Sequence, residues 1–206
     1  MNTTLEKIRH LASLRDRLVE TKKKLVTPIH EFEDIGNHSM AKLLTKTIKS
    51  SLTAIDKDLK NIESKIIDIV NEDDNLKLLF KLITSVVGIG FVTAINLLIH
   101  TNGFTMMKDA RKLACYCGVA PFEYSSGSSV RGKTKVHYMA NKKLKCNLHM
   151  ASLTAVKLDA DLKAYYERKV AEGKNKMSVL NAVKNKLLAR VVAVVNKQQE
   201  YVKKSA

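Results

Sequence analysis

Two glycines that flank one apolar residue form the first pattern with chemical potential. Gly88, Ile89 and Gly90 lie between two short helical patterns, within the segment 85–94. In a tight turn of this kind, backbone amides and the amino-terminal end of the second helix face outward, where they can bind a phosphate oxygen without reading base sequence. We expect Ile89 to be buried beneath the turn and Ala94 to let the two helices pack closely. An ordinary glycine-rich helix connection is the alternative.

A serine pair beside a glycine is the second pattern. Ser125 and Ser126 precede Gly127 in a segment rich in Gly and Ser, 118–138, which we expect to be a loop with a short extended piece near 130–138. A serine hydroxyl among many cations could attack a phosphodiester while those cations stabilise the developing charge. Basic residues follow the serines closely: Arg131, Lys133, Lys135, Lys142, Lys143 and Lys145.

The surroundings of this serine pair carry no signature of a serine hydrolase. The motif Gly-x-Ser-x-Gly is missing, so neither serine sits in the turn that presents the nucleophile of those enzymes. His137 and Glu123 are nearby groups that could transfer a proton. A loop histidine is more often structural or solvent-exposed, and Glu123 fits equally the role of salt-bridge partner to a lysine.

Positive charge is concentrated in the second half of the 206-residue chain. Residues 1–100 carry 15 basic and 13 acidic side chains, whereas residues 101–206 carry 21 basic and 7 acidic side chains. Repulsion of this size is relieved when a polyanion neutralises it and releases counterions, so we expect DNA or RNA as the partner. A membrane surface ranks well below them because the chain has no Trp and only 5% aromatic residues.

Composition also favours a cytoplasmic protein. The longest apolar stretch, 76–100, is interrupted by two lysines and a glycine, so it falls short of the roughly 20 apolar residues that a membrane span needs. The amino terminus lacks the basic and then apolar pattern of a secretory signal. Cys115, Cys117 and Cys146 are expected to be reduced thiols, and no second cysteine pair completes a metal site.

Helical spacing in the first 75 residues predicts a long antiparallel hairpin. Leu11, Leu18, Leu25 and Phe32 recur every seven positions, which predicts a helix over 3–32 with a kink or restart at Pro28. A second helix is expected over 40–70, with Ser39 as its N-cap. The spacing of its apolar residues is typical of a coiled-coil seam, filled either by the hairpin itself or by a second copy: Leu52, Ile55, Leu59, Ile62, Ile66 and Ile69.

The remaining residues predict a compact helical domain. The polar, acidic segment 71–75 marks the boundary, so the expected domains are 1–75 and 76–206. Helical patterns follow at 76–84, 92–100, 110–117, 139–158, 161–171 and 177–199. Because alternating strand patterns are otherwise absent, the fold class is all-α, and the turn at 88–90 resembles the helix-hairpin-helix of many DNA-repair and recombination proteins.

Several short motifs follow one another in a fixed order over about residues 76–195. They are Gly88-Ile89-Gly90, the segment 104–118, Ala120-Pro121, Ser126-Gly127, Asn141, Leu144, Tyr165-Tyr166-Glu167-Arg168, Gly173-Lys174 and Lys186-Leu187-Leu188. This order resembles the carboxy-terminal domain of the DEDD-type insertion-sequence transposases, relatives of the Piv DNA invertases. Two positions depart from the family pattern: Phe91 stands where a proline often begins the second hairpin helix, and Ala140 where a glycine usually precedes Asn141.

The resemblance implies a recombinase in which a serine of this domain attacks the DNA backbone. Ser126 falls on that serine, and its neighbour Ser125 is the alternative. The resemblance also implies an amino-terminal RuvC-like domain that holds a divalent metal such as Mg²⁺ through four acidic residues, and in some members a structured guide RNA. We find no pattern of such a domain before Thr3, so we expect a carboxy-terminal fragment or truncated form that has no cofactor of its own, is inactive alone, and forms a homo-oligomer through the hairpin.

The expected nucleic-acid contacts are Gly88, Ile89, Gly90, Thr93, Arg131, Lys133, Lys135, Asn141, Lys142, Lys143, Lys145, Lys174 and Lys186. A non-catalytic architectural or junction-binding protein, in which Ser126 is only a loop residue, is the rival interpretation. A helix-hairpin-helix DNA glycosylase fits less well because Asp109 is the only acid between Gly90 and Glu123, so no Lys and Asp pair follows the turn at a suitable distance.

Overall fold

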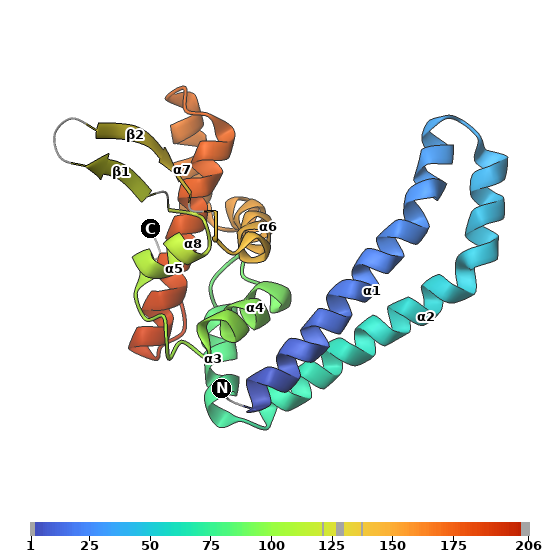
Figure 1. Cartoon of the computed structure of the whole chain (residues 1–206), viewed down its shortest axis with the longest axis horizontal. Helices are drawn as coiled ribbons and strands as arrows, with labels where there is room; N and C mark the ends of the chain where they lie inside the picture. The colour runs from blue at the N-terminus through green and yellow to red at the C-terminus, as the bar shows by residue number, and fades with distance from the viewer. Residues whose placement is uncertain (1–2, 121, 127–129, 137, 203–206) are drawn as a thin grey trace. The chain divides into compact units, whose positions relative to one another are not determined.

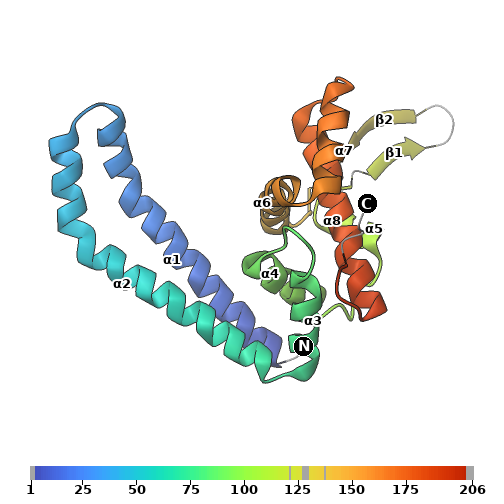
Figure 2. The same cartoon turned by 180° about the vertical axis from the view of Figure 1, so that it is seen from behind.

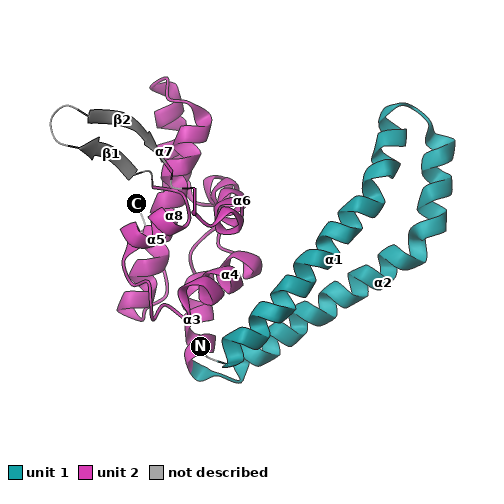
Figure 3. Cartoon of the chain, viewed as in Figure 1, with its two compact units in different colours: residues 1–74 teal, residues 75–206 magenta. Residues whose placement is uncertain are grey.

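Eight helices and one two-stranded antiparallel sheet make up the part of the chain that the structure describes (Figure 1). This computed structural model describes residues 3–120, 122–126, 130–136 and 138–202, and for residues 122–126 and 130–135 the backbone alone. The all-α fold class expected from the sequence is confirmed. The chain divides into two compact units, residues 1–74 and 75–206 (Figure 3).

The first unit is a hairpin of two long helices, α1 (Thr3–Asp34) and α2 (His38–Asn71), which pack along each other. The turn between them begins α2 earlier than expected. Asn37, not Ser39, is the N-cap, because its side-chain oxygen accepts a hydrogen bond from the amide of Met40 at 3.2 Å. The Ser39 hydroxyl instead donates to that same oxygen at 3.3 Å.

The predicted restart at Pro28 is wrong, since α1 continues through the proline to Asp34. A proline removes one helical hydrogen bond, but packing can hold a helix together across it. Ile29, the next residue, is buried, and so is Ala41 near the start of α2. Burial on both helices at this end of the hairpin therefore outweighs the local effect of Pro28.

The second unit contains six helices arranged around α8 (Lys176–Lys197). Figures 1 and 2 show α8 running along the unit, and it packs on α5 (Ala110–Tyr116), α6 (Lys142–Leu158) and α7 (Ala160–Ala171). The other two helices are α3 (Asp74–Thr84) and α4 (Phe91–Thr101), of which α4 packs on α6. Fully buried side chains at the centre include Leu113, Leu144, Leu148, Leu187, Leu188 and Val191.

The segment expected to be a loop contains a β-hairpin. Strand β1 (Phe122–Ser126) pairs antiparallel with β2 (Val130–Lys135). The expected extended piece near 130–138 is therefore real, but the assignment of Ser125 and Ser126 to a loop is wrong, because both lie in β1. The sequence contains the signal: Phe122 and Tyr124 alternate with polar residues, and a Gly-Ser-Ser run separates them from Val130.

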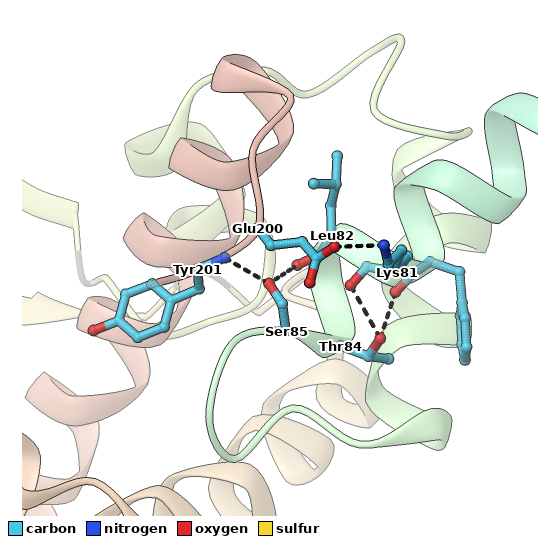
Figure 4. Close-up of polar contacts among 7 residues, drawn as sticks. Lys81, Leu82, Thr84, Ser85, Glu200 and Tyr201 are labelled. Atoms are coloured by element: carbon cyan, nitrogen blue, oxygen red, sulfur yellow. Dashed lines mark hydrogen bonds and ion pairs between the residues drawn. The ribbon is translucent and has the colours of Figure 1, made fainter. Parts of the chain in front are cut away.

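The chain after α8 returns to α3 and ties the two ends of the second unit together (Figure 4). The backbone amide of Tyr201 donates to the hydroxyl oxygen of Ser85 at 2.8 Å, and that hydroxyl donates to the carbonyl of Leu82 at 2.6 Å. Lys81 and Glu200 form an ion pair at 2.6 Å beside this contact. These bonds fix the end of α3, from which the glycine turn departs.

Gly88 is the point where the turn meets α6. Its φ is +95°, and a Cβ placed there would lie 2.7 Å from both the carbonyl oxygen of Ala151 and the Cβ of Ala155. Neither contact can relax easily, because both atoms belong to the helical turns of α6. Any other residue at Gly88 would push the turn away from the core helix and would also adopt an unfavourable backbone conformation.

We therefore expect Gly88→Ala to lower the free energy of unfolding by about 3 kcal/mol, the combined effect of backbone strain and overpacking. Gly90→Ala is the matched control, because Gly90 has a φ of −96° and open space where a Cβ would lie. It should change stability by no more than about 0.5 kcal/mol. Urea denaturation of both variants tests this, and equal stability of the two would contradict it.

Candidate nucleic-acid interface

The glycine turn has the local geometry expected for its apolar plug. Ile89 is buried, its amide donates to the carbonyl of Val86 at 3.0 Å, and Ala94 is fully buried on α4. Gly90 is exposed at the amino-terminal end of α4, where the first-turn amides face out of the helix. The side chain of Thr93 is buried, so it faces the core. Gly90 is thus the exposed member of the predicted set in this turn.

Close packing holds the β-hairpin that carries the serines at its root, which is formed by Gly118 and Val119 before β1 and by Ala140 and Asn141 after β2. Gly118 has a φ of +65°, and a Cβ there would lie 2.9 Å from the Cβ of Ala140 and 3.2 Å from Val136 Cγ1. The residues that enter the hairpin therefore touch the residues that leave it. From α8, the side-chain amide of Asn181 donates to the carbonyl of Val119 at 2.7 Å. Ala140 is accommodated here because Gly118 lacks a side chain.

Asn141 closes this root on the other side. Its backbone amide donates to the carbonyl of Tyr116 at 2.8 Å, and its side-chain oxygen caps α6 by accepting from the amide of Leu144 at 3.0 Å. Its side-chain nitrogen lies 3.2 Å from both Tyr116 Oη and His100 Nδ1. The sequence predicted a nucleic-acid contact for Asn141, and the structure gives its side chain intramolecular partners in α4, α5 and α6.

The predicted cations fall into three groups. Lys142 and Lys143 are exposed in the first turn of α6, directly after Asn141. Lys174 is exposed in the turn between α7 and α8, and the ammonium of Lys186 lies 4.5 Å from the centre of the Tyr165 ring, a cation–π contact. The root of the hairpin thus has two exposed cations beside it, whereas Lys174 lies in the turn between α7 and α8 and Lys186 lies on α8.

The side chains of the third group lie outside the described residues. The backbone register of the hairpin places Arg131 opposite Ser125, and Val130 opposite Ser126. Lys133 and Lys135 follow on the same strand. The side chain of Glu123 and residue His137, both considered above as proton-transfer groups, also lie outside the described residues.

The burial of Lys184 is the feature that the sequence analysis did not predict. This residue of α8 is only 4% exposed, although lysine on a helix is usually solvated. Its position had a signal, because Lys184 follows Leu180 and precedes Leu188 by four residues and so shares their buried face. Burial, then the nearby charge of Lys145, lower the pKa of its ammonium, whereas Cys146 acts in the opposite direction.

The cysteines behave as ordinary thiols. Burial raises the pKa of Cys117 to about 12, so this thiol stays protonated within the core. Within the described ranges, no three side chains of His, Cys, Asp or Glu come together in a metal-binding group. None of the described helices combines the length and the apolar character needed to cross a membrane.

Comparison with known proteins finds a similarity to one family. Residues 80–167, from α3 to α7, match the family model described as Transposase IS116/IS110/IS902 family. This stretch is therefore similar to the IS110-family transposases. The matched residues include the glycine turn, the β-hairpin and its root, whereas Lys184 lies beyond them.

Three curated relatives align with the chain beyond the family model. An uncharacterized 43.6 kDa protein of insertion element IS110 from Streptomyces coelicolor is 29% identical over 138 residues, which are 67% of this chain and 33% of the relative. The pilin gene-inverting proteins of Moraxella lacunata and Moraxella bovis are each 24% identical over 147 residues, 71% of this chain and 46% of theirs. The alignment thus spans less than half the length of each relative.

The lowered pKa of Lys184 leads to a prediction about the stability of this chain. The unfolded chain keeps its lysine proton up to about pH 10.5, whereas the folded chain releases it at lower pH, so stability rises with pH between the two values. At pH values below the pKa of Lys184 in the folded chain, the full free-energy penalty of holding the charged ammonium in the fold is present. We therefore expect Lys184→Met to be more stable than the wild type at pH 7, with a gap that narrows as the pH rises toward the unfolded value.

Urea denaturation at a series of pH values measures this gap. Lys197→Met is the matched control, because Lys197 is exposed in the last turn of the same helix. The difference between the control and the wild type should stay constant with pH. A Lys184→Met protein that is less stable than the wild type at neutral pH would contradict the electrostatic argument.

Proposed function

We propose that this chain is the DNA-binding and strand-transfer part of an insertion-sequence transposase or related recombinase. The observation that carries the proposal is the family match over residues 80–167, which contains Ser125 and Ser126 within one continuous segment. The named activity of the Moraxella relatives, pilin gene inversion, is a DNA rearrangement and agrees with this class of reaction. In this proposal the chain supplies one part of the machinery that carries out the rearrangement.

The charge distribution supports nucleic acid as the substrate. Residues 101–206 carry 21 basic and 7 acidic side chains, and this half contains the serine hairpin. Lys142 and Lys143 are exposed in the first turn of α6, where the helix dipole adds to their positive charge. A phosphate backbone that follows these cations would reach the root of the hairpin at Asn141. The exposed Gly90 and the amino-terminal end of α4 supply a second backbone contact.

Ser126 is the proposed nucleophile, with Ser125 as the alternative. Its hydroxyl oxygen would form a bond to phosphorus while one phosphorus–oxygen bond to the sugar breaks. The serine proton leaves, and the departing sugar oxygen gains a proton. The resulting serine phosphodiester conserves the energy of the broken bond, so a new strand can be joined without a separate energy source.

The remaining partners of this reaction are also proposals. Mg²⁺ is expected to bind a RuvC-like domain. The step described for Ser126 involves no ligand of this metal. A structured guide RNA is a second polyanion that the same basic surface could bind. A second copy of the chain is proposed to pack against α1 and α2, because six large apolar side chains of this hairpin are exposed: Leu14, Val19, Ile35, Met40, Leu43 and Ile67.

DNA binding should depend steeply on salt. We expect the affinity for a DNA duplex to fall roughly a hundredfold between about 50 and 200 mM salt, as it would when about four phosphates are neutralised. Lys142→Met with Lys143→Met should lower the salt slope by about two, whereas Lys57→Met with Lys60→Met, two exposed lysines of α2, should leave it unchanged. Fluorescence anisotropy measures both, with RNA titrated in parallel. Affinity that does not change with salt would contradict the proposal.

A covalent adduct should depend on Ser126. With a RuvC-like domain and Mg²⁺ supplied, we expect a protein–DNA adduct that survives denaturation, and Ser126→Ala should reduce its formation by at least about a thousandfold because the nucleophile is lost. Ser125→Ala is the matched control and should retain the adduct. Mass spectrometry of the digested adduct identifies the linked residue. Equal DNA binding by all three proteins with no adduct in any of them would favour the architectural role.

A further inference from the structure

Lys145 and Lys184 are two cations that both lie at the root of the serine hairpin. Lys145 lies in the second turn of α6, and its Cδ is 3.5 Å from the position of a Cβ at Gly118. Lys184 lies on α8, one turn after Asn181, whose side chain binds the carbonyl of Val119. Each lysine is therefore within one helical turn of a residue that anchors the hairpin.

Within the part of the chain that the structure describes, neither ammonium group has an acidic counterpart. Among the described residues, no hydrogen bond or ion pair involves the Nζ atom of Lys145 or of Lys184. Arg190, also on α8, differs from these two lysines because it has a carboxylate partner: it pairs with the buried Asp159 at 2.7 Å. A buried cation normally has such a partner, because removing a charge from water is costly.

The ammonium of Lys184 is not completely enclosed, although the residue is buried. Buried side-chain polar atoms that lack a partner in the described part of the chain are Asn96 Oδ1, Asn147 Nδ2 and His149 Nδ1, and Lys184 Nζ is not among them. Because this atom also has no hydrogen-bond partner among the described residues, it keeps some exposure. The stem of Lys184 is thus buried while its ammonium remains partly open, as in other long basic side chains.

This arrangement is costly without an anion and favourable with one. The charge of Lys145 acts on the ammonium of Lys184, whose stem is buried, and the amino-terminal end of α6 contributes further positive potential. A phosphate bound between them would neutralise both ammonium groups and would meet a lysine already fixed in position. Little side-chain entropy would then be lost on binding.

We propose that Lys145 and Lys184 together bind one phosphate of a DNA strand at the root of the serine hairpin. This inference rests on the proposed function, because it concerns the same strand that Ser126 would attack. It adds a fixed anion site on the helical core, outside the hairpin itself. Such a site would set how far the strand lies from the base of β1 and β2, which loop cations alone could not do.

The test compares Lys145→Met and Lys184→Met with two lysines at the opposite ends of the same helices. Lys157→Met on α6 and Lys197→Met on α8 remove the same charge from exposed positions. We expect each root variant to lose about fivefold to tenfold in affinity for a DNA duplex, and the double variant to lose less than the product of the two because both share one phosphate. The control variants should bind as the wild type does.

Single methylphosphonate substitutions along the duplex locate the phosphate. One position should weaken the wild type by about the same factor as Lys184→Met, and should not weaken Lys184→Met further. Because the buried stem is kept in methionine, a urea midpoint at or above that of the wild type shows that the variant folds. If Lys184→Met binds like Lys197→Met, or if every methylphosphonate affects both proteins alike, the inference is wrong although salt-dependent DNA binding stands.

The same titration with an RNA duplex of matched length identifies the source of the phosphate. A loss that is confined to RNA would assign the pair to RNA and overturn the DNA assignment. A loss on DNA, with or without a loss on RNA, supports it. If the wild type binds no nucleic acid in a salt-dependent manner, the proposed function itself fails, and this result differs from a failure of the lysine pair alone.

Discussion

The contact between Gly118 and the residues that leave the β-hairpin is the constraint on which the site depends. At this contact the chain enters and leaves the hairpin within van der Waals distance, and a side chain at Gly118 would separate the two ends. Asn181 from α8 and Asn141 from the start of α6 then fix each end by hydrogen bonds. A short hairpin gains a defined base in this way, although two strands alone are marginally stable.

A second constraint positions α6. The helix touches the backbone at Gly88 on one side and packs on α8 on the other. Its start carries the exposed Lys142 and Lys143, and its second turn carries Lys145. Because α6 is held by the close approach at Gly88, its cations keep a fixed position relative to the glycine turn. Two patterns that are predicted to bind nucleic acid, and that are distant in the sequence, are thereby linked through one helix.

Most of the fold could be predicted from the sequence, because the local spacing of apolar residues indicates where each helix lies. The bounds of α3, α4, α5 and α7 lie within two residues of those expected, whereas α6 begins at Lys142 because Asn141 caps it. Tertiary features carry no such local signal. Hydrogen bonds join His100 of α4, Tyr116 of α5 and Asn141 at the start of α6. Neither the spacing nor the type of these residues predicts that they meet. The hairpin was missed because the serines and glycines around it are typical of loops.

Lys184 shows how residue type can mislead where spacing does not. Its place on the face of Leu180 and Leu188 predicts burial, while the usual exposure of lysine predicts the opposite. Spacing prevails because the aliphatic stem fills the core and only the ammonium needs water. A methionine there would pack equally well and would avoid the charge. The presence of lysine is therefore unfavourable for folding alone, and a residue of this kind is explained more simply by binding than by stability.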